Sequence, residues 1–161
     1  MKIEGSWKLA APRETVFRQL MDPRFLARSL PGCEKLDPLP DGSYQATLKI
    51  GVGAMKGTYQ GRVEIVDALP PESFRIKVEG KGAGGFVKGE GKISLTAENG
   101  ETLLNYTGEA QVGGVIASVG QRMIQAAARQ IVDQFFAAFS RTLLPSPASS
   151  TPSGGAGSPA S

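Results

Sequence analysis

Alternation of apolar and polar residues runs through most of this chain and limits its fold more than any other feature. Residues 1–9 alternate strictly, and five later segments repeat the pattern with one apolar face and one largely charged or polar face. Such alternation predicts antiparallel strands with one face on a core and the other in water. From Val115 to Leu144 the apolar spacing becomes three and four residues, which predicts one long amphipathic helix ended by Pro145.

Two short helices are expected between the first strand and the other five. Pro12 suits the first position of one helix, Asp22 suits the N-cap of the next, and Pro31-Gly32 ends it. One face of the sheet needs a cover, and the long helix is the only predicted element large enough. We therefore expect an α+β helix-grip fold, in which a curved antiparallel sheet, two short helices and one long C-terminal helix enclose a hydrophobic cavity.

Composition changes at the C-terminal end of the chain. Residues 1–144 are long enough to form one domain with its own core. Residues 145–161 are rich in Pro, Ser, Gly and Ala and contain no charged and no large apolar side chain. Such a segment buries too little surface to fold, so we expect a disordered tail.

The chain contains no histidine and a single cysteine, Cys33. This composition excludes Ser-His and Cys-His nucleophilic pairs and His-ligated metal sites. A net charge of +3 is too small to favour nucleic acid. Neither a signal peptide nor a run of about 18 apolar residues is found. We expect a cytoplasmic protein with no catalytic residues, no cofactor, no metal and no nucleic-acid partner.

Glycines are concentrated in residues 77–92, where Gly80, Gly82 and Gly85 match the pattern G-x-G-x-x-G. A dinucleotide-binding turn needs a helix to begin at the third glycine, because the helix N-terminus holds the pyrophosphate. Here Phe86 begins another alternating segment, so the pattern does not indicate a nucleotide site.

Seven glycines share the apolar face of their strands: Gly5, Gly61, Gly80, Gly82, Gly89, Gly91 and Gly108. Glycine inside a strand marks either a bend or the close approach of another group. These glycines therefore either permit curvature or leave a cavity under the helix, and the two interpretations are compatible. An apolar ligand oriented by phenolic hydroxyls would suit such a cavity. The predicted ligand-binding residues are Tyr44, Leu48, Tyr59, Gly61, Phe74, Ile76, Gly89, Tyr106, Gly108, Met123 and Ile124.

Glycine-rich connections are expected to meet at one end of the sheet, because successive hairpins alternate between the two ends. Their apolar side chains and neighbouring lysines suit shallow contact with an anionic membrane, although flexible hairpin tips with scattered lysines would look the same. The predicted membrane-contact residues are Val52, Met55, Lys56, Phe86, Lys88, Val115 and Ile116.

Five stretches of the chain resemble the carbon monoxide dehydrogenase CoxG family of the START-like, Bet v 1-like (SRPBCC) superfamily. They are LPGCEKL (30–36), KIGVGAMKGTYQGRVEIVDALPPESF (49–74), GKGAGGFVKGEGKISL (80–95), YTGEAQVGGVIASVGQRMI (106–124) and DQFFAAF (133–139). Their shared order makes the resemblance more specific than any single glycine motif.

The resemblance implies a non-catalytic accessory protein of a molybdenum-containing carbon monoxide dehydrogenase or related hydroxylase. Such a protein would bind a quinone or lipid in its cavity and link the enzyme to the inner face of the cell membrane by peripheral contact. Two alternatives remain open: a small cyclase- or dehydratase-type enzyme of the same superfamily, and a structural adaptor. Acidic residues avoid the inward strand phase, which disfavours the enzyme.

Overall fold

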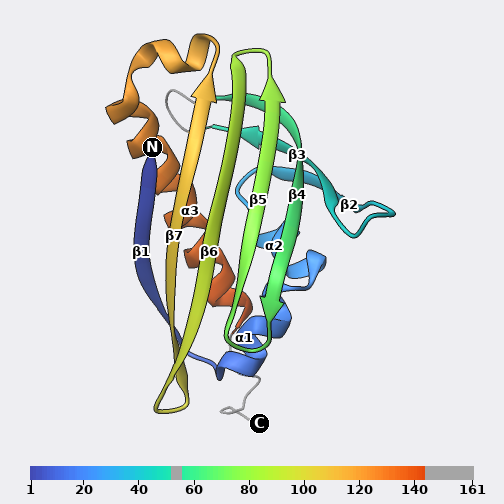
Figure 1. The fold of residues 1–161 in the computed structure, drawn as a ribbon, viewed down its shortest axis with the longest axis vertical. Helices are drawn as coiled ribbons and strands as arrows, with labels where there is room; N and C mark the ends of the chain where they lie inside the picture. The colour runs from blue at the N-terminus through green and yellow to red at the C-terminus, as the bar shows by residue number, and fades with distance from the viewer. Residues whose placement is uncertain (52–55, 144–161) are drawn as a thin grey trace.

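A curved antiparallel sheet of seven strands lies against one long helix in the computed structural model, which describes residues 1–51 and 56–143 (Figure 1). The sheet order is β1-β7-β6-β5-β4-β3-β2. In chain order the elements are β1 (Lys2–Leu9), α1 (Arg13–Leu20), α2 (Pro23–Ser29), β2 (Cys33–Pro38), β3 (Tyr44–Ile50), β4 (Gly57–Leu69), β5 (Ser73–Gly82), β6 (Gly85–Glu98), β7 (Glu101–Gly113), η2 (Val115–Val119) and α3 (Gln121–Thr142). The helix-grip fold expected from the sequence is confirmed. The tail expected at 145–161, Val52 and Met55 lie outside the described residues.

The two short helices follow the chemistry of their first residues. In α2, the carboxylate of Asp22 accepts a hydrogen bond from the backbone N–H of Arg24 at 2.9 Å, which confirms the predicted N-cap. Helix α1 buries Val16, Phe17 and Leu20 in the core. Together α1 and α2 lie at the end of the sheet that holds the β4–β5 and β6–β7 hairpins (Figure 1).

Strand β2 was not predicted, so the sheet has one strand more than expected. It pairs antiparallel with β3, but its register shifts between Cys33 and Lys35. This irregularity leaves Glu34 and Lys35 exposed in succession and breaks the alternation that marks the other strands. An edge strand with a bulge therefore gives a weak sequence signal.

The predicted long helix is interrupted at Gly120. Residues Val115–Val119 form the 3-10 helix η2, and α3 begins only at Gln121. Gly120 has a φ of 96°, which an α-helix does not contain. Apolar residues at Ile116 and Ile124 continued the helical spacing across this break, so periodicity alone did not reveal it.

Helix α3 is attached to the sheet along the edge strand β1. The indole N–H of Trp7 donates to the hydroxyl of Ser140 at 3.0 Å, and the Gln125 amide donates to the backbone oxygen of Lys2 at 3.0 Å. Trp7 also stacks on Phe136, with ring centroids 5.8 Å apart. These contacts hold α3 over the inner face of the sheet near β1.

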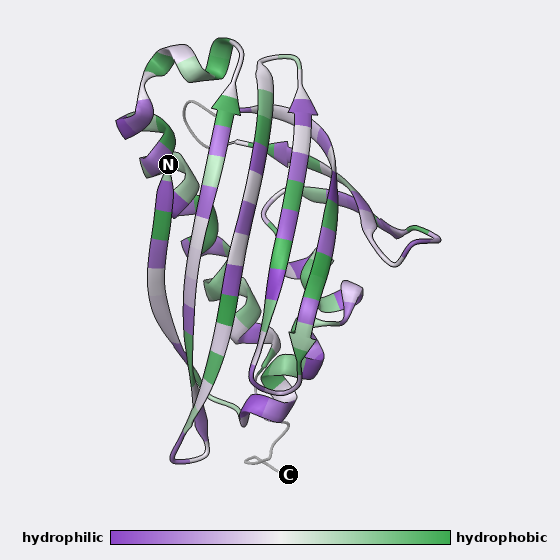
Figure 2. Ribbon diagram, viewed as in Figure 1, coloured by the Kyte–Doolittle hydropathy of each residue, from purple (hydrophilic) through white to green (hydrophobic). Residues whose placement is uncertain are grey.

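Buried side chains form two separate clusters along the inner face. The larger cluster contains Phe74, Leu104 and Phe139 and extends to α1 and α2. The smaller cluster consists of Ile50, Tyr59, Ile116 and Ala127. Figure 2 shows the alternating hydropathy of the strands that supplies both clusters from one face.

Candidate functional site

The inner face between the two clusters carries small residues. Across β7, β6, β5 and β4, the register pairs Ala110 with Gly89, Gly89 with Val78, and Val78 with Val63. Val63 and Val78 belong to neither cluster and are only half-buried, although they point to the same side as the buried residues. We call this row of four residues the central row. Its exposure marks a part of the concave face that side chains leave unfilled.

Glycines on the inner face separate into two structural groups. A Cβ atom on Gly61 would collide with the backbone carbonyl of Glu79, and one on Gly82 would lie 2.5 Å from the oxygen of Thr58. These glycines allow neighbouring backbones to approach, as the curvature interpretation requires. A Cβ on Gly80 would meet nothing closer than 4.0 Å, and one on Gly108 nothing closer than 3.3 Å. Space therefore lies in front of the second group, and each interpretation applies to different glycines.

Two inner-face tyrosines border the central row from opposite sides. Tyr59 lies in the smaller cluster, and Tyr106 packs against the larger one and stacks on Phe136 at 5.4 Å. Burial raises the pKa of both phenols; near Tyr106, Arg129 opposes this rise and Asp133 adds to it. Both phenols are therefore protonated near neutral pH and can donate a hydrogen bond.

The predicted ligand-binding residues do not form one continuous lining. Leu48 and Tyr59 are cross-strand partners at the smaller cluster, whereas Phe74 packs edge-on against Phe17 in the larger cluster, with centroids 5.8 Å apart. Of the others, Ile124 is buried and Tyr44, Gly61, Ile76, Gly89, Tyr106 and Gly108 are half-buried.

Met123 differs from the prediction, because 56% of it is exposed. The buried residue at this turn of α3 is its neighbour Ile124, so a one-residue step around the helix decides which side chain faces the sheet. The prediction also omitted Val63, Val78 and Ala110, which their strand phase had placed on the inner face. Their small size made them less conspicuous than the aromatic residues.

Buried polar side chains serve local hydrogen bonds. Ser29 donates to the backbone oxygen of Phe25 at 2.8 Å, and Thr102 donates to that of Ala11 at 2.7 Å. In residues 1–51 and 56–143, no group of three or more Asp, Glu, Cys or His side chains could hold a metal ion. The concave face therefore offers shape and phenolic hydroxyls as its recognition elements.

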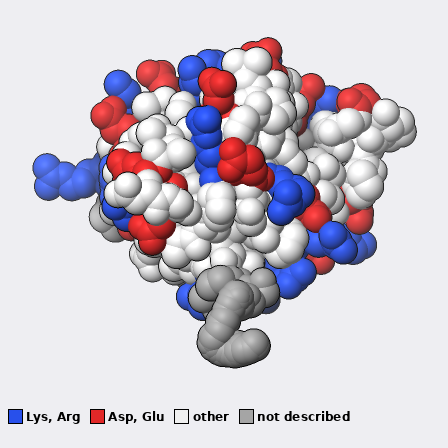
Figure 3. All heavy atoms as spheres, turned by 90° about the horizontal axis from the view of Figure 1, so that it is seen from below, with Lys and Arg blue, Asp and Glu red and all other residues white. Residues whose placement is uncertain are grey.

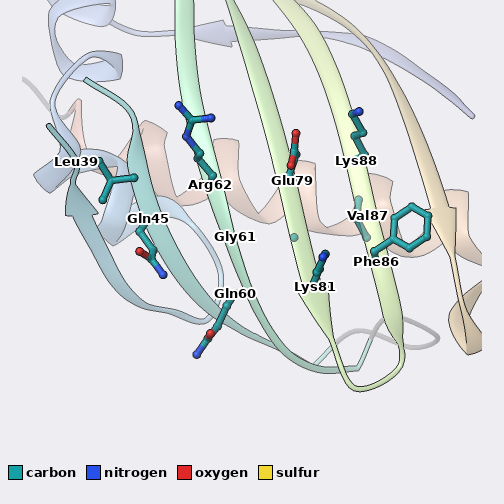
Figure 4. A pocket seen from close by; sticks show the side chains of 11 residues that line it. Leu39, Gln45, Gln60, Gly61, Arg62, Glu79, Lys81, Phe86, Val87 and Lys88 are labelled. Atoms are coloured by element: carbon teal, nitrogen blue, oxygen red, sulfur yellow. The ribbon is translucent and has the colours of Figure 1, made fainter. Parts of the chain in front are cut away.

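A hollow of about 410 Å³ lies on the opposite, outer face of the sheet (Figure 4). It spans β3 to β6 and includes Gly61 and Gly80, with Arg62, Glu79 and Lys88 among the side chains around it. Arg62 donates to the hydroxyl of Ser43 at 2.9 Å and pairs with Asp41. Its charged rim distinguishes this hollow from the apolar inner face.

Exposed apolar side chains gather at the end of the molecule that holds η2 and the β5–β6 hairpin (Figure 1). Phe86 is 44% exposed, Val115 74%, Val119 45% and Met123 56%. We call these four residues the apolar end surface. Of these, Phe86 and Val115 were predicted as membrane-contact residues, whereas Val119 and Met123 were not.

Ile116 is a correction to the predicted membrane-contact set. It is buried in the smaller cluster, and its N–H donates to the oxygen of Gly84 at 2.9 Å. The 3-10 turn directs it inward and anchors η2 to the β5–β6 hairpin. The predicted lysines of this set, Lys56 and Lys88, are exposed.

The opposite end of the molecule has a different surface. Acidic and basic side chains alternate there, as Figure 3 shows. Leu69, which is 62% exposed, is the large apolar side chain that stands out among the described residues of this end. Among the described helices, none combines the length and apolar character needed to cross a membrane.

Comparison with solved structures supports the fold at several levels of identity. A conserved protein from Geobacillus kaustophilus is 37% identical over 89% of this chain and 95% of its own, with a TM-score of 0.86. A START superfamily protein from Mycobacterium smegmatis is 15% identical over 88% of this chain and 96% of its own, with a TM-score of 0.67. Protein CV1439 from Chromobacterium violaceum is 19% identical over 88% and 96%, with a TM-score of 0.67. The two more distant structures support the fold alone.

Comparison with curated proteins gives no match. The family model for CoxG, a carbon monoxide dehydrogenase protein, matches residues 5–144, which include all seven strands apart from the first residues of β1. Because this match covers most of the chain, the protein belongs to the CoxG family.

Proposed function

We propose that this protein is a non-catalytic accessory protein of a carbon monoxide dehydrogenase-type molybdenum hydroxylase. It binds an apolar ligand, such as a quinone or lipid, between the sheet and α3, and it links the enzyme to the membrane through the apolar end surface. Membership of the CoxG family supports the enzyme partner.

The observation that carries the ligand proposal is the central row between two separate clusters. Val63 and Val78 face α3 yet keep part of their surface exposed. Covering apolar surface stabilises a complex by about 25 cal/mol per Å², so these side chains favour an apolar occupant. Space in front of Gly80 and Gly108 provides room for it.

Phenolic hydroxyls provide the polar part of the proposed site. Within the described residues, the Tyr59 hydroxyl makes no hydrogen bond to protein, and burial raises its pKa. A buried tyrosine usually places its hydroxyl on a partner. A carbonyl oxygen of a quinone or lipid ester would accept this hydrogen bond.

The ligand proposal is tested by extracting the purified full-length protein with organic solvent and analysing the extract by mass spectrometry. Wild type should release an isoprenoid quinone or a lipid. Gly80→Leu fills space on the inner face and should remove most of this material, whereas Glu79→Leu on the outer face of the same strand should retain it. Equal extraction from both variants would place the ligand elsewhere.

The partner proposal needs a separate measurement. The full-length protein should retain a purified carbon monoxide dehydrogenase-type hydroxylase on liposomes that do not bind the enzyme alone. Enzyme recovery with the vesicles should depend on the accessory protein. Absence of any recovery would contradict the linking role without affecting the ligand proposal.

A further inference from the structure

Strand β7 extends beyond the described part of its neighbour β1. Met1 and Ala110 exchange two backbone hydrogen bonds, of 2.9 Å and 3.1 Å. Beyond this pair, residues 111–113 of β7 have no β1 partner among the described residues. The edge of the sheet is therefore open on the side where η2 and the start of α3 lie.

A second hollow, of about 400 Å³, lies at this open edge. Its lining includes Met1, Ala110, Val112, Ala117, Gln121 and Ile124, which come from the ends of β1 and β7, from η2 and from the first turns of α3. It lies in the same end of the molecule as the apolar end surface, and Phe86 belongs to both.

This hollow leads toward the inner face of the sheet. Ala110 is the β7 member of the central row, and Val112 packs against the smaller cluster. Ile124 is buried behind them at 4% exposure. Because β1 does not continue along this part of β7, side chains rather than a paired strand separate the hollow from the central row.

Helix η2, which forms one wall, has glycine at each end. Gly114 has a φ of 84° and Gly120 a φ of 96°. Ile116 is the buried residue of η2, while Val115, Ala117, Ser118 and Val119 are exposed. A segment held by one apolar anchor between two glycines can move with little loss of buried surface.

We propose that the hollow between η2, the start of α3 and the open end of β7 is the entrance through which the apolar ligand reaches the central row. This inference rests on the proposed function of the concave face. The outer hollow does not serve as an entrance, because β4 and β5 lie so close at Gly61 that a Cβ atom would collide with the Glu79 carbonyl.

An entrance is distinguished from a binding site by kinetics. Trp7 is the only tryptophan and packs on Phe136, so its fluorescence reports a quinone in the concave face without an added label. We would mix the full-length protein with decylubiquinone in a stopped-flow instrument and follow quenching. Ala117→Phe and, independently, Gln121→Phe narrow the hollow. Ala126→Phe adds the same side chain to an exposed position of α3 outside this hollow.

Both narrowing variants should slow association and dissociation by about tenfold, the effect of about 1.4 kcal/mol of added barrier, with unchanged equilibrium affinity. Ala126→Phe should behave as wild type. Wild-type rates in both narrowing variants, with quenching intact, would overturn the entrance alone. Weaker equilibrium binding with an unchanged association rate would also overturn it, because the hollow would then be a binding site. No quenching of wild type would overturn the proposed quinone binding, and the entrance with it.

Discussion

Tyr106 lies across Gly5, its cross-strand partner in β1. A Cβ atom on Gly5 would be 2.6 Å from the Tyr106 hydroxyl oxygen and 2.9 Å from Cζ. The same ring stacks on Phe136 of α3. Glycine at position 5 therefore lets the phenol lie flat over β1 and link the edge of the sheet to the long helix.

Replacing Gly5 should expose this dependence. Gly5→Val forces the Tyr106 ring away from Phe136 and should lower the free energy of unfolding by about 1–3 kcal/mol, as overpacking does. In a Tyr106→Leu background the same change should cost much less, because no ring occupies the space. A double-mutant cycle by chemical denaturation measures this coupling. Additive effects of the two substitutions would contradict the contact.

Gly61 and Gly80 are cross-strand partners that should respond oppositely to alanine. Gly61→Ala pushes a methyl group into the Glu79 carbonyl and should destabilise the fold by about 2–3 kcal/mol or more. Gly80→Ala meets open space and should leave stability unchanged or raise it, since alanine orders a strand better than glycine. Thermal and denaturant unfolding of the two variants provide the comparison. Similar losses for both would mean that the space at Gly80 is not present in solution.

The apolar end surface should carry binding to anionic vesicles. Val115→Asp combined with Val119→Asp removes exposed apolar contact and adds negative charge, so binding to vesicles of phosphatidylglycerol and phosphatidylcholine should fall strongly. Leu69→Asp makes the same kind of change at a similarly exposed position of the opposite end and should have no effect. Co-sedimentation measures both. Loss of binding only in Leu69→Asp would reverse the orientation on the membrane.

Asp41 should contribute pH-dependent stability. Hydrogen bonds from Ser43, and then the Arg62 guanidinium, lower the pKa of this carboxyl from 3.8 to about 2. Because the pKa is lower in the folded state, the contribution is complete above the unfolded value and is lost as the pH falls from 3.8 toward about 2. The stability difference between wild type and Asp41→Asn should therefore be constant near neutral pH and shrink across this acidic range. A difference that does not change between about pH 5 and the acid limit would contradict the linkage.

Much of the architecture followed from the sequence because side-chain phase is a local property. Alternation placed Tyr59, Phe74 and Tyr106 on one face of the sheet, and the N-cap at Asp22 was readable from residue type alone. The CoxG resemblance, drawn from five glycine-rich or apolar stretches, agrees with the family model that matches residues 5–144.

Tertiary structure decided what each glycine does and which residues border the unfilled part of the concave face. Phase alone assigns Gly61 and Gly80 the same role, but the distance to the neighbouring backbone depends on register and on how strongly the strands coil. Likewise, the positive φ of Gly120 rotated Ile116 inward and left Met123 outside. These outcomes depend on contacts between segments far apart in the chain, which a local pattern of apolar residues does not encode.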